Sequence, residues 1–240
     1  MKPTKLNPPL RLLGAALAFL FCAGAAHAWW NGEWTLRKKI TVDTSDTGAA
    51  LSGPIGTVPL LVRLHDGNFQ FPAAKDDGTD LRFVADDDKT LLPFHIEKYD
   101  SLLDEAFIWV KIPDLKPGAK TSIWLYYGNS GSRAIKADDP KGTYDADTVL
   151  VYHFSEHGQP AYDFTSSGNN AQNAGTPADG TIIGTGLRFD GSARVAIPAS
   201  PSLDWAEGAP LTWSAWIKPL APQPNAVIFS RAEEGRAFAV

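Results

Sequence analysis

Short segments in which apolar and polar residues alternate dominate the chain after residue 28. Alternation with a period of two is the pattern of a β-strand with one buried face. Loops rich in proline, glycine and aspartate separate these segments, and no apolar repeat of helical period exceeds two turns. The strands expected in the first half cover residues 34–42, 58–64, 81–85, 94–99, 106–112 and 121–127.

The same pattern resumes after a polar break over residues 138–142, so we place a domain boundary near Asp145. A long stretch rich in glycine and asparagine, residues 163–180, interrupts the second half. The strands expected there cover residues 148–154, 187–189, 193–197, 211–218, 226–230 and 236–240. The sequence therefore predicts an all-β protein of two β-sandwich or jelly-roll-like modules, residues 29–145 and 146–240.

The second module is expected to be incomplete. A jelly roll has about eight strands, whereas the pattern gives roughly six here. The last expected strand also runs into an apolar terminus, residues 236–240. We therefore expect a jelly roll that is truncated at its C-terminus.

The first 28 residues have the pattern of a secretory signal peptide. Basic residues come first, an apolar run over residues 12–26 follows, and Ala26-His27-Ala28 provides a small-x-small cleavage sequence. The apolar run is shorter than the about 20 residues of a membrane-spanning helix, although an uncleaved anchor is the alternative. Phe21 before Cys22 disfavours a lipoprotein signal. The protein is therefore expected to be exported to the periplasm or the cell surface.

Processing is predicted to occur between Ala28 and Trp29, because the basic start, the apolar run and the cleavage sequence coincide. N-terminal sequencing of the exported protein should then begin at Trp29. A mature protein that begins at Met1 or at Cys22 would contradict the prediction.

Charge and cysteine content exclude several classes of function. The net charge is −5 and no run of lysine and arginine forms a basic patch, which argues against a nucleic-acid partner. The one cysteine, Cys22, lies in the predicted signal peptide. After cleavage the protein would have neither a disulfide nor a cysteine nucleophile.

Several phrases resemble known families. In the second half, Asp163 to Asn170, Gly186 to Gly191 and Leu211 to Pro219 together resemble the start of a concanavalin-A-like, laminin-G-type jelly roll. The phrases of the first half resemble a bacterial extracytoplasmic domain of unknown function that often precedes such a module. They are Trp29-Trp30-Asn31 and residues 80–84, 93–97 and 124–129.

In some proteins of this kind, membrane helices of the MotA/TolQ/ExbB proton-channel group follow the two domains. The resemblance therefore implies the extracytoplasmic part of an energised biopolymer transport protein. No apolar span follows residue 28, so a membrane would be a partner only through a missing C-terminal part.

His95 and Glu97 are the strongest candidates for chemistry, because they lie two apart on one face of an expected strand. They could act as an acid–base pair or bind a metal, but the sequence shows no third ligand for zinc. His153 is interpreted as a strand residue with a hydrogen-bonded ring. Glu233 and Glu234 are adjacent and so face opposite sides of a strand. We therefore expect a polar strand face and no catalytic residues.

Acidic loops raise the question of calcium. Asp76-Asp77-Gly78-Thr79-Asp80 and Asp86-Asp87-Asp88 lack the spacing of a calcium loop and are interpreted as solvated turns. Asp163 with Asn169, or Asp190, could supply calcium oxygens, although turn-forming hydrogen bonds explain the same residues. No cofactor is expected to be required, and calcium is the one candidate ion.

These observations favour a non-enzymatic binding module for a glycan or an envelope protein. Trp213 and Trp216 face opposite sides of an expected strand; core packing is expected for both, with a stacking face for a ligand as the alternative. The alternative function is a polysaccharide hydrolase of the concanavalin-A-like class. Such an enzyme needs paired carboxylates, which the sequence does not show.

Overall fold

The computed structural model describes residues 29–131, 137–206, 208–221, 224–233 and 236–239. The predicted signal peptide therefore lies outside the described residues. The chain divides into two compact units, residues 1–203 and 204–240. Each unit is described by itself below.

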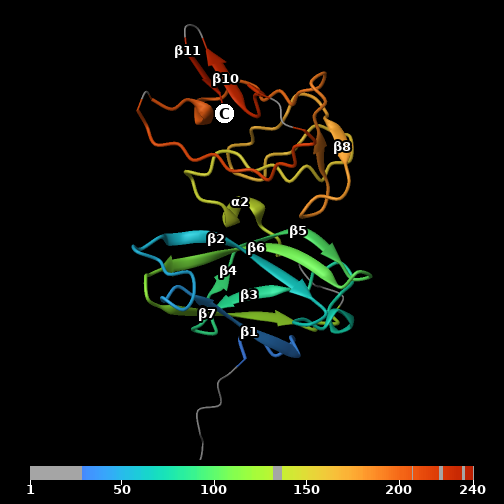
Figure 1. Cartoon of the computed structure of the whole chain (residues 1–240). Coiled ribbons are helices and arrows are strands. Elements are labelled where there is room, and N and C mark those ends of the chain that lie inside the picture. Colours follow the sequence, from blue (N-terminus) through green and yellow to red (C-terminus); the bar gives the residue numbers. More distant parts are fainter. Residues whose placement is uncertain (1–28, 132–136, 207, 222–223, 234–235, 240) are drawn as a thin grey trace, which may run out of the picture. The chain divides into compact units, whose positions relative to one another are not determined.

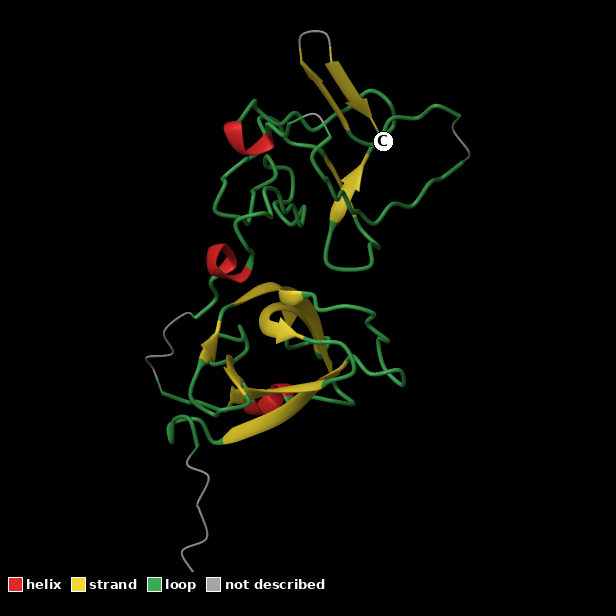
Figure 2. Cartoon of the chain, turned by 90° about the vertical axis from the view of Figure 1, so that its left-hand side faces the viewer, coloured by secondary structure: helices red, strands yellow, loops and turns green. Residues whose placement is uncertain are grey.

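A sandwich of two antiparallel sheets forms the first part of the first unit (Figures 1 and 2). One sheet has the order β1-β7-β3-β4, from Leu36–Asp43, Lys120–Tyr127, Arg82–Ala85 and Leu91–Leu92. The other has the order β2-β6-β5, from Gly56–His65, Glu105–Leu115 and Phe94–Asp100. All six strands expected in the first half are present, and the prediction of an all-β protein is confirmed.

The core lies between the two sheets and takes alternate residues from each strand. Leu125 and Ile123 of β7 and Ile108 and Val110 of β6 are almost fully buried and belong to one apolar cluster with Leu64 of β2. Ile123 pairs with Ile40 across the β1–β7 ladder, so both point to the same face. A shift of the register by one residue would turn this whole set towards solvent.

Short helical turns connect the strands. They are the 3₁₀ turns Phe71–Ala73 and Pro201–Leu203 and the α2 turn Pro140–Thr143, which is capped by the side chain of Asp139. The chain before α2 runs beside β5, where the Asp139 N–H donates to the Phe94 carbonyl. Lys111 of β6 donates to the Gly142 carbonyl. The segment that follows the sandwich is thus attached to the sheet that contains β5 and β6.

The expected strands over residues 148–154 and 193–197 are irregular in the structure. Side chains, and not a neighbouring strand, hydrogen-bond the backbone there. The Val151 N–H donates to the Asp163 carboxylate, and the Asn173 amide bonds the backbone of both Arg194 and Ala196. Phe154 also has a φ of 56°, which interrupts an extended chain. The regular pairing in this part of the first unit is a short hairpin of β8 (Thr176–Ala178) and β9 (Gly186–Arg188).

The described residues of the second unit form one hairpin, β10 (Ser230–Glu233) with β11 (Arg236–Ala239). The prediction of a strand over residues 211–218 is wrong, because this segment has no ladder partner among the described residues. Core packing is also wrong for Trp216, which is 82% exposed. Trp213 is half-buried and stacks against Phe229.

No helix in the described ranges combines the length and hydropathy of a membrane span.

Candidate functional site

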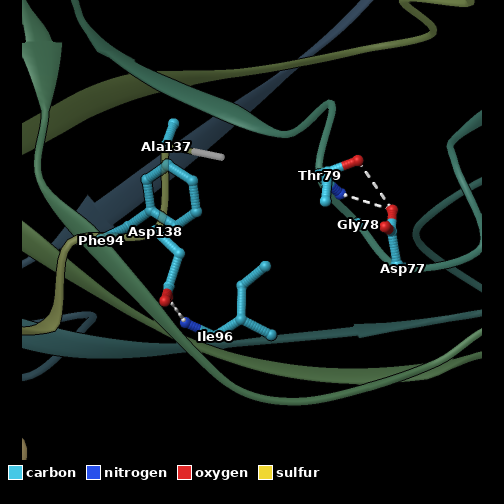
Figure 3. Close-up of a pocket in the computed structure, with 7 residues that line it drawn as sticks. All are labelled: Asp77, Gly78, Thr79, Phe94, Ile96, Ala137 and Asp138. Carbon is cyan, nitrogen blue, oxygen red and sulfur yellow. Dashed lines mark hydrogen bonds between the residues drawn. The ribbon is translucent and has the colours of Figure 1, made fainter. Parts of the chain in front are cut away.

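A pocket of about 220 Å³ opens beside the start of β5 (Figure 3). The turn of Asp77, Gly78 and Thr79 lies on one side of it, as Figure 3 shows. Phe94 and Ile96 of β5, together with Ala137 and Asp138, complete the lining. The pocket thus combines an aromatic ring and aliphatic groups with two carboxylates and a hydroxyl.

A tight turn holds Asp77 at the mouth of the pocket. Its Oδ1 accepts hydrogen bonds from the Thr79 N–H at 3.0 Å and the Thr79 hydroxyl at 2.7 Å. These bonds to the Thr79 side chain and backbone lower the pKa of Asp77. Gly78 has a φ of 67° and lies against the Tyr99 ring, where an added Cβ would approach to 2.8 Å. The turn therefore requires glycine at this position.

Asp138 connects the pocket with the interior. Its Oδ1 accepts the Ile96 N–H at 2.6 Å and lies 3.1 Å from Nδ1 of His95. The side chain of His95 is 4% exposed. Its Nε2 is buried and has no hydrogen-bond partner within the part of the chain that the structure describes.

A second histidine–carboxylate pair, His153 with Glu97, stacks on the pair of His95 and Asp138 through the two imidazole rings. The ring of His153 stacks on that of His95, with centroids 5.1 Å apart, and its Nδ1 is 3.1 Å from Oε1 of Glu97. The other oxygen of Glu97 accepts the Trp109 indole N–H at 2.6 Å. The Tyr144 hydroxyl lies 3.4 Å from Nε2 of His153. We call His95, Glu97, Asp138, Tyr144 and His153 the histidine cluster.

The surroundings of Glu97 in the histidine cluster keep its carboxylate ionised. Burial raises the pKa of Glu97, but hydrogen bonds from His153 and Trp109 and the charges of both histidines outweigh it, so the pKa is lowered. Burial raises the pKa of Tyr144 and keeps the phenol protonated. A general acid needs a carboxyl with a raised pKa, and Glu97 has the opposite shift.

The sequence identified part of this cluster. His95 and Glu97 do lie close together, but a β-bulge places Glu97 between Ile96, which pairs with Ile108, and Lys98, which pairs with Phe107. His153 was expected to be a strand residue; it lies in an irregular segment and pairs with Glu97. Asp138 was missed because only the fold brings residues so far apart in sequence together. No group of three or more His, Cys, Asp or Glu in the described ranges is arranged to hold a metal ion.

The other acidic residues singled out from the sequence are engaged in turns and ion pairs. Asp87 caps a turn by accepting the Thr90 N–H and hydroxyl. Asp88 bonds Arg37 and the Tyr126 hydroxyl, and Asp86 lies 3.9 Å from Lys39. The loop is a turn, as expected, but Asp88 corrects the expectation that it is solvated, because its carboxylate is only 13% exposed and is paired.

Buried Asp80 anchors the pocket turn to the end of β7. Its carboxylate accepts the backbone N–H groups of Lys75, Gly128 and Asn129. Asp76 is exposed.

Asp163 is fully buried and accepts four hydrogen bonds. The donors are the N–H groups of Val151, Thr165 and Asn169 and the Thr165 hydroxyl. Asn169 in turn donates to the Val149 carbonyl and to Ser202. Protein donors thus engage both oxygens of Asp163, and a calcium ion there would have to replace them.

The remaining candidates lie at the surface or outside the description. Asp190 is exposed and accepts the Ser192 N–H and hydroxyl, which lower its pKa. Glu233 ends β10, and Glu234 lies outside the described residues.

Comparison with known proteins adds one finding. A family model described as "Domain of unknown function (DUF2341)" matches residues 77–166. No curated protein and no solved structure matches the chain. Residues 77–166 are thus similar to this family of unknown function, and they contain both the pocket and the complete histidine cluster.

Proposed function

We propose that the protein is a non-enzymatic, extracytoplasmic binding module whose pocket holds one residue of a glycan chain. The pocket beside β5 carries the proposal. Its volume of about 220 Å³ is below the about 300–1,000 Å³ of pockets that enclose a whole small ligand. A pocket of this size suits one sugar residue of a longer chain.

The lining of the pocket supports a sugar as ligand. Phe94 and Ile96 offer apolar contacts for the C–H face of a sugar ring, while Asp77, Thr79 and Asp138 provide acceptors for its hydroxyl groups. Asp77 is exposed at the mouth, so its carboxylate can exchange water for a ligand hydroxyl.

The Thr79→Val variant is expected to weaken glycan binding by about 2- to 10-fold, because it removes one hydroxyl worth about 0.5–1.5 kcal/mol. Thr90→Val is the matched control, because Thr90 makes the same contacts with Asp87 but does not line the pocket. Calorimetric titration with envelope polysaccharides would measure both. Equal affinities of wild type and Thr79→Val would contradict the assignment of the pocket.

A polysaccharide hydrolase is the second candidate, because Asp77 and Asp138 both line the pocket, as Figure 3 shows. Paired carboxylates are what a glycosidase requires, one of them protonated. The lowered pKa of Asp77 leaves it ionised, so in such an enzyme Asp77 would be the nucleophile or base and not the acid. Incubation with the same polysaccharides tests this candidate. New reducing ends that the wild type releases and the Asp77→Asn variant does not release would favour the hydrolase.

The proposal also covers the domains that accompany this binding module. The second half is proposed to be a laminin-G-type jelly roll, and the whole chain to be the periplasmic or surface part of a TolQ/ExbB-type transport protein. The similarity of residues 77–166 to the family of unknown function supports the first half of this pairing.

A further inference from the structure

A second depression shares a neighbour with the glycan pocket, because Tyr99 contacts a lining residue of each. It measures about 500 Å³ and is lined by Asp66, Asp104 and the stretch Phe69 to Ala73. The Phe71 ring of this depression lies 5.5 Å from the Tyr99 ring, and Gly78 of the pocket lies against the same ring. Tyr99 therefore contacts one residue of each lining.

All charged groups in the two linings are carboxylates. Asp77 and Asp138 line the pocket and Asp66 and Asp104 line the depression, whereas no described lysine or arginine belongs to either lining. His65 lies 3.5 Å from Asp66. Lys75 acts on Asp77, but its ammonium group donates to the Gly131 carbonyl.

The pKa of Tyr99 responds to the carboxylates around its ring. Burial and the charges of Asp80, Asp76, Asp77 and Asp104 all raise the pKa of its phenol. The Tyr99 hydroxyl is buried and lacks a hydrogen-bond partner among the described residues. The carboxylates that line both hollows thus make these surfaces negative, which attracts cations and repels anions.

We propose that the glycan is cationic: an oligosaccharide whose residues carry free amino groups, lying across the pocket and the depression. This rests on the proposed glycan-binding function. The carboxylates at both ends would pair with ammonium groups on successive sugars, and the aromatic and aliphatic walls would contact the rings. Anionic glycans would meet like charges in both hollows.

The test is calorimetric titration of the full chain with three tetramers: glucosamine, N-acetylglucosamine and galacturonic acid. The glucosamine tetramer should bind most tightly and the galacturonic acid tetramer least. Asp77→Asn and Asp104→Asn should each weaken glucosamine binding by about 1.5- to 5-fold, as expected for exposed ion pairs. Both variants should weaken N-acetylglucosamine binding less than glucosamine binding, because a neutral sugar can lose only hydroxyl contacts. Asparagine also tolerates the φ of 50° at Asp104.

Asp87→Asn is the control for bulk charge, because it removes one exposed carboxylate in a similar turn away from both hollows. An equal loss of affinity in Asp87→Asn would overturn the proposal, since it would indicate diffuse attraction. Equal or tighter binding of the neutral or the anionic tetramer would also overturn it, while leaving glycan binding intact. If neither the three tetramers nor the envelope polysaccharides bind, the proposed function itself is overturned.

Discussion

Replacing Glu97 with alanine is expected to destabilise the first unit by about 3–5 kcal/mol, the usual cost of removing one partner of a buried ion pair. The side chain of Glu97 is 9% exposed and that of His153 6% exposed. Without the carboxylate, Nδ1 of His153 and the indole N–H of Trp109 both lose their acceptor in a buried environment.

Glu105→Ala is the matched control on the same sheet. Glu105 pairs with Lys98 and with the largely exposed Arg63, so its loss should cost no more than about 1 kcal/mol. Amide exchange is the appropriate measurement, because a chain of two units need not unfold in one step. Protection in β5, in β6 and over residues 149–165 should fall in Glu97→Ala and persist in Glu105→Ala. Unchanged protection in Glu97→Ala would show that the pair is not needed for stability.

The same pair gives the stability a defined pH dependence. The pKa of Glu97 in the folded protein is below its ordinary value of 4.5, so the unfolded chain binds the proton more tightly. The stabilisation is therefore complete above about pH 4.5 and is lost as the pH falls through the lowered pKa of the folded state. Other acidic groups, such as Asp43 with a pKa of about 2, titrate in the same window. The free energy of unfolding should therefore be measured against pH for the wild type and for Glu97→Gln. The difference between the two curves isolates the contribution of Glu97.

The sandwich was predictable because each of its strands carries its own signal. Ile123 and Leu125, for example, alternate with the partly exposed Ser122 and Trp124 and are buried by the opposite sheet. The segment 211–218 shows the limit of this reasoning. It alternates as well, yet no sheet covers it among the described residues, and Trp216 remains exposed. Alternation indicates a strand only where a partner strand is available.

The site was less predictable than the fold. His95 and Glu97 stand out in the sequence because they are two apart, but their partners Asp138 and His153 are 43 and 56 residues away, respectively. The contact between His153 and Glu97 was also not predicted, because residues 148–154 were interpreted as a strand. A polar loop with fixed aspartate and asparagine side chains, residues 163–170, holds that segment in its irregular path.

This loop supports the pocket through a chain of contacts. Phe164 follows the buried Asp163, and its ring lies 4.5 Å from that of His95 and 4.7 Å from that of His153. His95 in turn contacts Asp138, which lines the pocket. Loss of order in the loop should therefore loosen one wall of the pocket.

Asp163→Ala is accordingly expected to unfold residues 149–171 locally while the sandwich persists. The substitution leaves four donors without their acceptor, three of them backbone N–H groups. Each buried unsatisfied group costs about 1–3 kcal/mol, so a loss of about 4 kcal/mol or more is expected for this segment. Amide exchange should show the loss at Val151, Phe164 and Asn169, with β1 and β7 still protected.

Asp190→Ala is the control, because Asp190 makes a similar turn with Ser192 at an exposed position and should change protection little. Glycan affinity should fall in Asp163→Ala and not in Asp190→Ala, since only the first disturbs the contacts of Phe164 with His95. Loss of protection throughout β1 and β7 in Asp163→Ala would show instead that loop and sandwich unfold together. Retained protection at Val151 would show that the loop does not depend on this carboxylate, because water or a neighbouring acceptor would then have replaced it.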